Sequence, residues 1–149
     1  MQIGVRALRL TLATGLQSFE KIRTEKVFYI DKSNFIKEWW DRKDDIALII
    51  RPRRFGKTLN ISMLECFFST KYAGRGDLFE GVSVWDNEKY RELQGTYPVI
   101  NLSFAQVKSA NYEGARNMIC QIITQVFKSF RDSIDMDRLD KVDKEFFVA

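Results

Sequence analysis

The sequence predicts an α/β fold with a parallel sheet at its core, on three observations. The first is a wholly apolar run at residues 46–50, as in a strand buried on both faces of a parallel sheet. The second is a helical pattern that follows this run closely. The third is another strand pattern at residues 99–104, far enough along the chain for the crossover that parallel strands require.

The chain before the first strand predicts two short helical elements and one more strand. Residues 18–23 form a helical turn and residues 27–30 a strand, and Asp31 or Ser33 can then cap a helix. That helix carries its large apolar residues on one face at Phe35, Ile36, Trp39 and Trp40. The charged residues 41–45 turn the chain back into the apolar run.

The helix after the first strand begins near Thr58 and keeps Ile61, Leu64 and Phe68 at spacings of three and four. A turn at 73–76, a helical turn near 90–95 and the strand at 99–104 follow. From residue 111 a helical stripe returns, and we expect it to face the core: Tyr112, Ala115, Ile119, Ile122, Val126 and Phe130. The aspartates between 132 and 143 are typical of a solvated face rather than a metal site.

The loop between the first strand and its helix ends in Gly56-Lys57-Thr58, the second half of a phosphate-binding loop. In such loops the glycine lets backbone N–H groups close on a phosphate, the lysine reaches the β and γ oxygens, and the hydroxyl ligates Mg²⁺. The first glycine of the full motif is replaced by Arg51. Pro52 stiffens that turn, so its geometry differs from that of a glycine turn.

The same loop is strongly basic, because no acidic residue occurs from 46 to 64. Clustered cations repel one another unless an anion lies among them, and guanidinium and ammonium groups suit polyphosphate. We therefore predict that residues 51–58 form a nucleotide-binding loop and that Thr58 also holds Mg²⁺. The residues expected to bind the nucleotide are Arg51, Arg53, Arg54, Phe55, Gly56, Lys57 and Thr58. The alternatives are a solvated basic loop and a nucleic-acid-binding patch.

Several segments together resemble one family. They read VFYIDKSNFIKEWW (27–40), RPRRFGKT (51–58), LNISMLECFF (59–68), DLFEGVSVW (77–85) and YPVINLSF (97–104). From about residue 14 onward the chain resembles the AAA-ATPase-like domain of bacterial and archaeal proteins, in which an arginine at position 51 is typical and a PD-(D/E)XK nuclease-like domain usually follows. The resemblance implies a three-layer α/β/α P-loop NTPase that uses ATP and Mg²⁺, with residues 29–33 near the base.

The family also carries an apolar strand that ends in acidic residues, the Walker B strand, and no run of this chain fits it. We therefore expect residues 1–149 to be one incomplete domain, truncated before that strand, with an atypical or disordered stretch at 1–13. The missing strand would lie between the two strands present here, which would leave a splayed sheet or a direct new pairing. Hydrolysis by this chain alone is not expected, and no catalytic residue is assigned.

Composition excludes some classes of site. A formal charge of +4 is mildly basic, and the lack of histidine removes histidine bases and Cys/His zinc sites. Cys66 and Cys120 fall in predicted helices and are expected to be buried, reduced thiols. No window reaches the apolar length of a membrane span, so we expect a cytoplasmic protein.

Three functions stay open on the sequence. The first is the ATP-binding N-terminal part of an AAA-ATPase-like protein, whose full length would also contact nucleic acid. The second is a nucleic-acid-binding module that uses the basic loop, with affinity that falls steeply with salt. The third is an inactive truncated product. Oligomeric state and the choice between ATP and GTP are not indicated.

Overall fold

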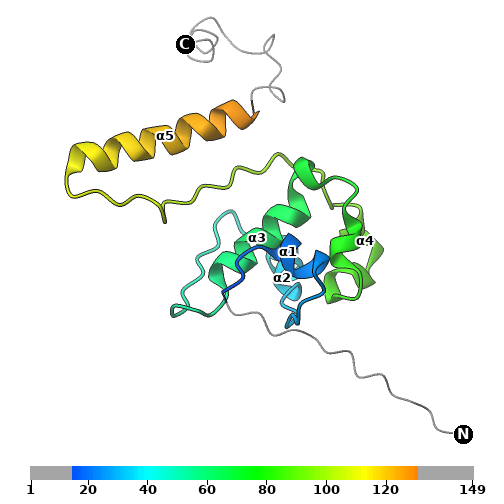
Figure 1. Ribbon diagram of the computed structural model, residues 1–149. Helices are drawn as coiled ribbons and strands as arrows, with labels where there is room; N and C mark the ends of the chain where they lie inside the picture. The colour runs from blue at the N-terminus through cyan, green and yellow to red at the C-terminus, as the bar shows by residue number, and fades with distance from the viewer. Residues whose placement is uncertain (1–14, 131–149) are drawn as a thin grey trace, which may run out of the picture. The chain divides into compact units, whose positions relative to one another are not determined.

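The computed structural model describes residues 15–130, which belong to two compact units, Met1–Val99 and Ile100–Ala149. The described part of the first unit is a cluster of helices (Figure 1). They are α1 (Phe19–Thr24), α2 (Asn34–Arg42), α3 (Lys57–Phe68), the 3₁₀ turns η1 (Thr70–Tyr72), η2 (Gly76–Phe79) and η3 (Ser83–Asp86), and α4 (Glu88–Arg91). The second unit contributes α5 (Tyr112–Phe130).

The predicted parallel-sheet core, and with it the three-layer α/β/α P-loop architecture, is wrong. Within residues 15–130 no strand forms, and the β pairing found there is one isolated parallel bridge between Ser69 and Tyr97. The run at 46–50, predicted to be buried on both faces, is largely in solvent, with Ile46, Leu48 and Ile50 exposed by 87%, 81% and 80%. The helices were predicted at nearly the right places, so the error lies in the predicted pairing of strands into a sheet.

A physical reason for this error is that a strand is defined by its neighbour. An apolar, β-branched run favours extended backbone, but its N–H and C=O groups need a partner chain before a ladder exists. In the described part of the chain, residues 27–30, 46–50 and 99–104 form no strand ladder, and Ile100, Leu102 and Phe104 are exposed. The sequence led us to expect either a splayed sheet or direct pairing of the predicted strands. Direct pairing does not occur among the described residues.

The core of the first unit is built around the C-terminal half of α3. Met63, Cys66, Phe67 and Phe68 are buried there, against residues of α1, α2 and the 3₁₀ turns. The ring of Phe67 lies 4.9 Å from that of Phe68 and 5.2 Å from that of Phe79, both edge-on. Such edge-to-face pairs add to the free energy gained by burying the rings. Of the residues whose spacing predicted this helix, Phe68 is buried but Ile61 is exposed, so the predicted stripe marks the buried face only in part.

Three backbone hydrogen bonds hold residues 95–97 against the C-terminal end of α3. Gly95 N donates to Phe67 O (2.8 Å), Tyr97 N to Phe68 O (2.8 Å) and Thr70 N to Tyr97 O (2.9 Å). Gly95 has a φ of +71°, and a Cβ there would lie 2.5 Å from Ala73 Cα. Only glycine fits this close approach.

Helix α2 begins where predicted, but its capping differs. Ser33 occupies the N-cap position without capping the helix through its side chain. Its buried hydroxyl instead accepts a hydrogen bond from Val84 N (3.0 Å). The neighbouring Asp31 accepts from Ser33 N and Ser83 N, both at 2.8 Å, and from the Ser83 hydroxyl. These bonds fix residues 31–33 to η3.

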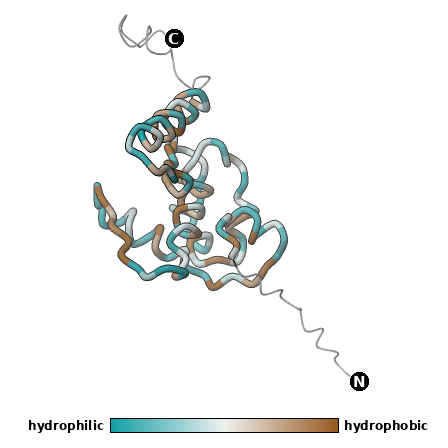
Figure 2. The backbone as a smooth tube through the Cα atoms, turned by 60° about the vertical axis from the view of Figure 1, so that its left-hand side comes forward, coloured by the Kyte–Doolittle hydropathy of each residue, from teal (hydrophilic) through white to brown (hydrophobic). Residues whose placement is uncertain are grey.

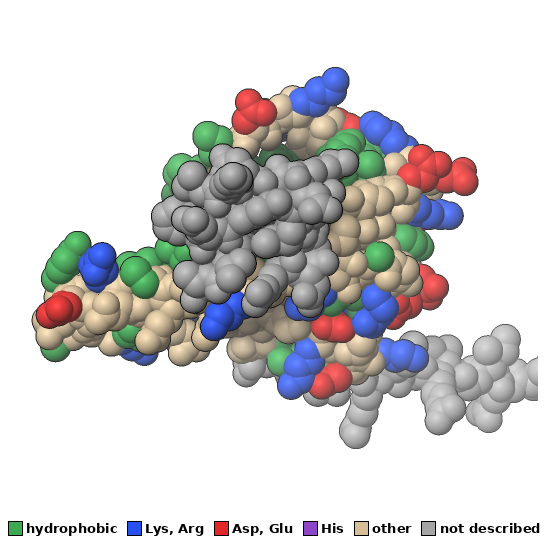
Figure 3. Space-filling model, turned by 90° about the horizontal axis from the view of Figure 1, so that it is seen from above, with side chains coloured by type: hydrophobic (Ala, Val, Ile, Leu, Met, Phe, Trp, Pro, Cys, Tyr) green, Lys and Arg blue, Asp and Glu red, His purple; other side chains and the backbone are tan. Residues whose placement is uncertain are grey.

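In the second unit α5 is confirmed as a long helix, and Asn111 caps it by accepting from Gly114 N (2.8 Å). Figure 2 shows apolar and polar residues alternating along it. The prediction that its stripe faces the core is wrong for the described residues, since none of the helix is buried. Cys120 is likewise exposed, whereas Cys66 is buried as predicted. Hydrophobic side chains stand at the surface among charged ones in Figure 3.

Two sequence-based expectations lie outside the described residues: the atypical stretch at 1–13 and the aspartates between 132 and 143. Between residues 15 and 130, no helix combines the length and the hydrophobicity that crossing a bilayer requires.

Candidate functional site

The candidate site is the junction where the basic loop enters α3. Gly56 is the N-cap residue, with φ +76° and ψ +20°, a left-handed conformation that glycine adopts without steric cost. Asn60 N donates to Gly56 O (2.9 Å), which closes the first helical turn. No side chain caps this end. The N–H groups of the first turn are thus left for an acceptor from outside the helix, and an anion suits both them and the helix dipole.

The loop holds a second left-handed residue, Arg54, at φ +70°. For a residue with a Cβ this conformation costs roughly 1–2 kcal/mol. Left-handed residues in tight turns bring successive backbone N–H groups to one side and form anion-binding concavities. The loop therefore keeps a costly backbone geometry next to an uncapped helix end.

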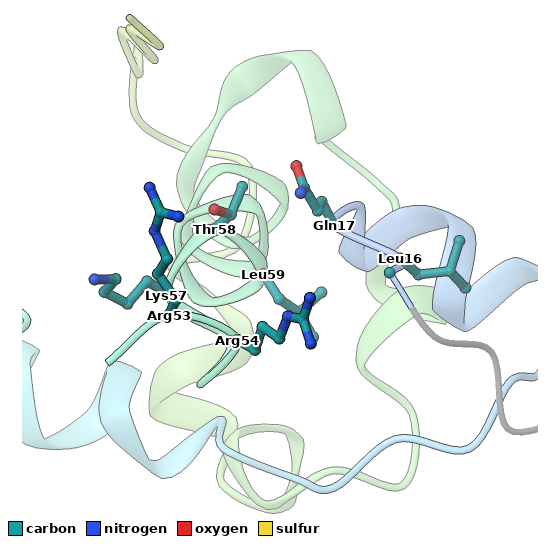
Figure 4. A pocket seen from close by; sticks show the side chains of 9 residues that line it. Leu16, Gln17, Arg53, Arg54, Lys57, Thr58 and Leu59 are labelled. Carbon is teal, nitrogen blue, oxygen red and sulfur yellow. The ribbon is translucent and has the colours of Figure 1, made fainter. Parts of the chain in front are cut away.

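A concavity of about 840 Å³ opens at this junction, within the size range of small-molecule sites. Figure 4 shows the side chains that surround it. They come from the chain just before α1 and from the loop and first turn of α3: Gly15, Leu16, Gln17, Arg53, Arg54, Gly56, Lys57, Thr58 and Leu59. The lining thus combines backbone amides, three cations, a hydroxyl, an amide side chain and two leucines.

The Lys57 ammonium folds back over the loop and donates a hydrogen bond to Arg51 O at 2.6 Å. In Figure 4 the side chains of Arg53 and Lys57 extend to one side of the loop and that of Arg54 to the other. A single carbonyl satisfies only one of the three ammonium donors. The lysine therefore remains able to bind an anion at the loop.

Within the described residues, no carboxylate forms an ion pair with the cations of this loop. Among residues 15–130, the ion pairs join Lys21, Lys71, Arg75 and Lys89 to carboxylates on α1, α2, α3 and η2 and to Glu25, which follows α1. None of these pairs includes Arg51, Arg53, Arg54 or Lys57. Gathered cations raise the local potential and attract anions.

Five of the seven predicted binding residues line the concavity: Arg53, Arg54, Gly56, Lys57 and Thr58. Arg51 contributes its backbone carbonyl to Lys57, and Phe55 is exposed outside the lining. Leu16 and Gln17 were missed by sequence reasoning. No motif marks them, because they reach the loop only through the packing of α1 on α3.

A magnesium ion would find one protein ligand here, the Thr58 hydroxyl. Within the described residues no group of three or more acidic or cysteine side chains could hold a metal ion. Mg²⁺ keeps several waters and is often bound through one or two protein groups plus substrate phosphates. The residues present therefore fit a metal that arrives with a phosphate chain.

Comparison with known proteins gives one family and one relative. A family model for AAA-ATPase-like domains, described as predicted AAA-ATPase, matches residues 13–147. An uncharacterized protein in the vnfD 5' region of Azotobacter chroococcum mcd 1 is 31% identical over 117 residues, which cover 78% of this chain and 21% of that protein. The chain thus spans about a fifth of the relative's length. No solved structure matches the chain.

Proposed function

Because this chain belongs to the AAA-ATPase-like family, whose members have a general ATPase-like role, we propose that residues 51–58 bind the phosphates of ATP together with Mg²⁺. The observation that carries the proposal is the uncapped N-terminus of α3 behind a left-handed Gly56, which opens on a concavity lined by three cations that form no ion pair within the described residues. Each of these features favours an anion, and they occur at one place.

The proposed roles follow from the chemistry of each group. The amides of the first turn of α3 bind phosphate oxygens, and Lys57 exchanges the Arg51 carbonyl for the β and γ phosphates. The Thr58 hydroxyl ligates Mg²⁺. Arg53 and Arg54 neutralise the remaining charge from opposite sides of the loop.

The proposal covers binding and not hydrolysis. In-line attack on a γ-phosphate needs a metal held in place and a positioned water. No carboxylate is found among the described residues that line the concavity.

Thermal unfolding of the full 149-residue chain tests the proposal. Mg-ATP at 100 times its Kd stabilises a protein that binds it only when folded by about 2.7 kcal/mol. We expect that stabilisation for the native chain and none for Lys57→Ala. The matched control is Lys71→Ala, which removes the same charge beyond the far end of α3, about 18 Å along the helix axis. This control should keep the full response.

A DNA oligomer and magnesium-free ATP complete the experiment. We expect ATP without magnesium to bind more weakly and the oligomer to give no stabilisation at low micromolar concentration. Stabilisation by the oligomer alone, lost steeply as salt rises, would instead support a nucleic-acid-binding loop. No response to any of the three ligands would contradict the proposal.

A further inference from the structure

The side chain of Lys32, which lies outside the loop, reaches Gly56. A Cβ built on Gly56 would lie 3.2 Å from Lys32 Nζ, so the ammonium of Lys32 rests against the backbone at the start of α3. Lys32 belongs to the connection between α1 and α2, far from the loop in sequence. The fold thus brings a further cation to the proposed phosphate site.

The backbone that carries Lys32 is fixed on three sides. Asp31 and Ser33, its two neighbours, are hydrogen-bonded to Ser83 and Val84 of η3. The N–H of Lys32 itself donates to the Tyr29 hydroxyl (3.2 Å), which lies 3.3 Å from Met63 Sδ in α3. A lysine on a fixed base loses less conformational freedom when it binds a ligand than one on a mobile loop.

The Lys32 ammonium has no carboxylate to neutralise it in the described part of the chain. None of the ion pairs found there includes Lys32, and no hydrogen bond from its Nζ to a protein acceptor is found there either. An ammonium has three donors. Lys32 is exposed, and its ammonium lies against Gly56, one of the residues that line the concavity, with its donors left for an acceptor from outside the described residues.

We propose that Lys32 is a second lysine of the phosphate site, and that it binds the phosphate chain of the nucleotide from the side of the loop formed by Gly56. This inference rests on the proposed function. It assigns the segment at 29–33, expected from the family resemblance to lie near the base, to the phosphates instead. Its ligand class is a polyphosphate, with or without a nucleoside attached.

The test titrates the full chain with Mg-ATP and with inorganic tripolyphosphate by calorimetry. A charge-assisted hydrogen bond typically contributes enough for a tenfold change in affinity. Lys32→Met should therefore weaken both ligands about tenfold and make their binding less sensitive to salt. Lys32→Arg, which keeps the charge, should restore most of the affinity. Lys71→Met is the matched control and should bind like the native chain.

The outcomes separate this inference from the proposed function. If the native chain binds both ligands, Lys57→Ala abolishes binding and Lys32→Met binds as tightly as the native chain, the inference is overturned while the loop retains its role. If the native chain binds neither ligand, both are overturned. Without ligand, the native chain and Lys32→Met are expected to have the same melting temperature. If the variant melts at a lower temperature and its reduced stability explains the whole loss of affinity, a direct contact between Lys32 and the phosphates is contradicted.

Discussion

The two ends of α3 differ in almost every physical property. At the C-terminal end Cys66, Phe67 and Phe68 are buried among aromatic rings, and backbone bonds from 95–97 close the helix. At the N-terminal end Gly56 leaves the first turn uncapped, and the loop before it is exposed and positively charged. One helix thus joins a hydrophobic core to a candidate binding site.

The difference teaches that stability and ligand binding should respond to different residues of the same helix. Changes at the C-terminal end remove buried area, which is costly because the surroundings relax only partly. Changes at the N-terminal end remove exposed groups that the fold does not need. The predictions below test this separation.

The largest effect is expected for Phe67→Ala. Truncating a buried phenylalanine typically costs about 3–5 kcal/mol, and Phe67 also loses its edge-on contacts with Phe68 and Phe79. Urea denaturation followed by circular dichroism measures the loss. The control is Phe55→Ala in the exposed loop, which should change the unfolding free energy by less than about 0.5 kcal/mol. Similar costs for the two variants would remove the distinction between the ends.

A smaller effect is expected for Asp31→Asn, which weakens the anchoring of residues 31–33 to η3. Burial raises the pKa of the Asp31 carboxyl, but hydrogen bonds from Ser83 and Ser33 outweigh it and lower the pKa to about 2. The charged carboxylate therefore stabilises the fold above about pH 4, and this contribution is lost as the pH falls from about 4 toward 2. Because the group is largely exposed, we expect about 1 kcal/mol at pH 7.

The measurement for Asp31 is the difference in unfolding free energy between the native chain and Asp31→Asn, from pH 6 down to pH 2. The difference should be constant above pH 4 and shrink below it. A difference that grows as the pH falls would show that the carboxylate destabilises the fold.

The smallest effect is expected for Arg54→Gly, and its sign is opposite. Glycine removes the cost of the left-handed conformation at φ +70°, partly offset by the greater freedom of glycine in the unfolded chain. We expect a gain of about 0.5–1 kcal/mol in the unfolding free energy. Affinity for Mg-ATP should fall, because a cation of the concavity is lost. A variant that is both less stable and equally tight in binding would contradict this interpretation of the loop.

The sequence predicted what depends on neighbours in the chain and failed where distant segments meet. The helical turn predicted at residues 18–23 and the spacing of Ile61, Leu64 and Phe68 indicated α1 and α3, because helical periodicity is local. The runs at 46–50 and 99–104 predicted a sheet wrongly, because strands need partners that no local pattern specifies.

The candidate site likewise contains residues that the sequence predicted and residues that it missed. The spacing of Gly56, Lys57 and Thr58 predicted a loop at a helix start, and they lie there. Gln17 and Lys32 could not be predicted, because only the packing of α1 and of the connection to α2 brings them to the loop. That the loop binds nucleotide stays a prediction.

The most direct test of the central claim is a titration of the ¹⁵N-labelled chain with Mg-ATP, followed by amide chemical shifts. Binding at the loop should shift the amides of Gly56, Lys57 and Thr58 strongly and leave those of Phe67, Phe68 and Gly95 nearly unchanged. Saturable binding that leaves the amides of residues 56–58 unshifted would contradict the assignment of the phosphate site to the start of α3.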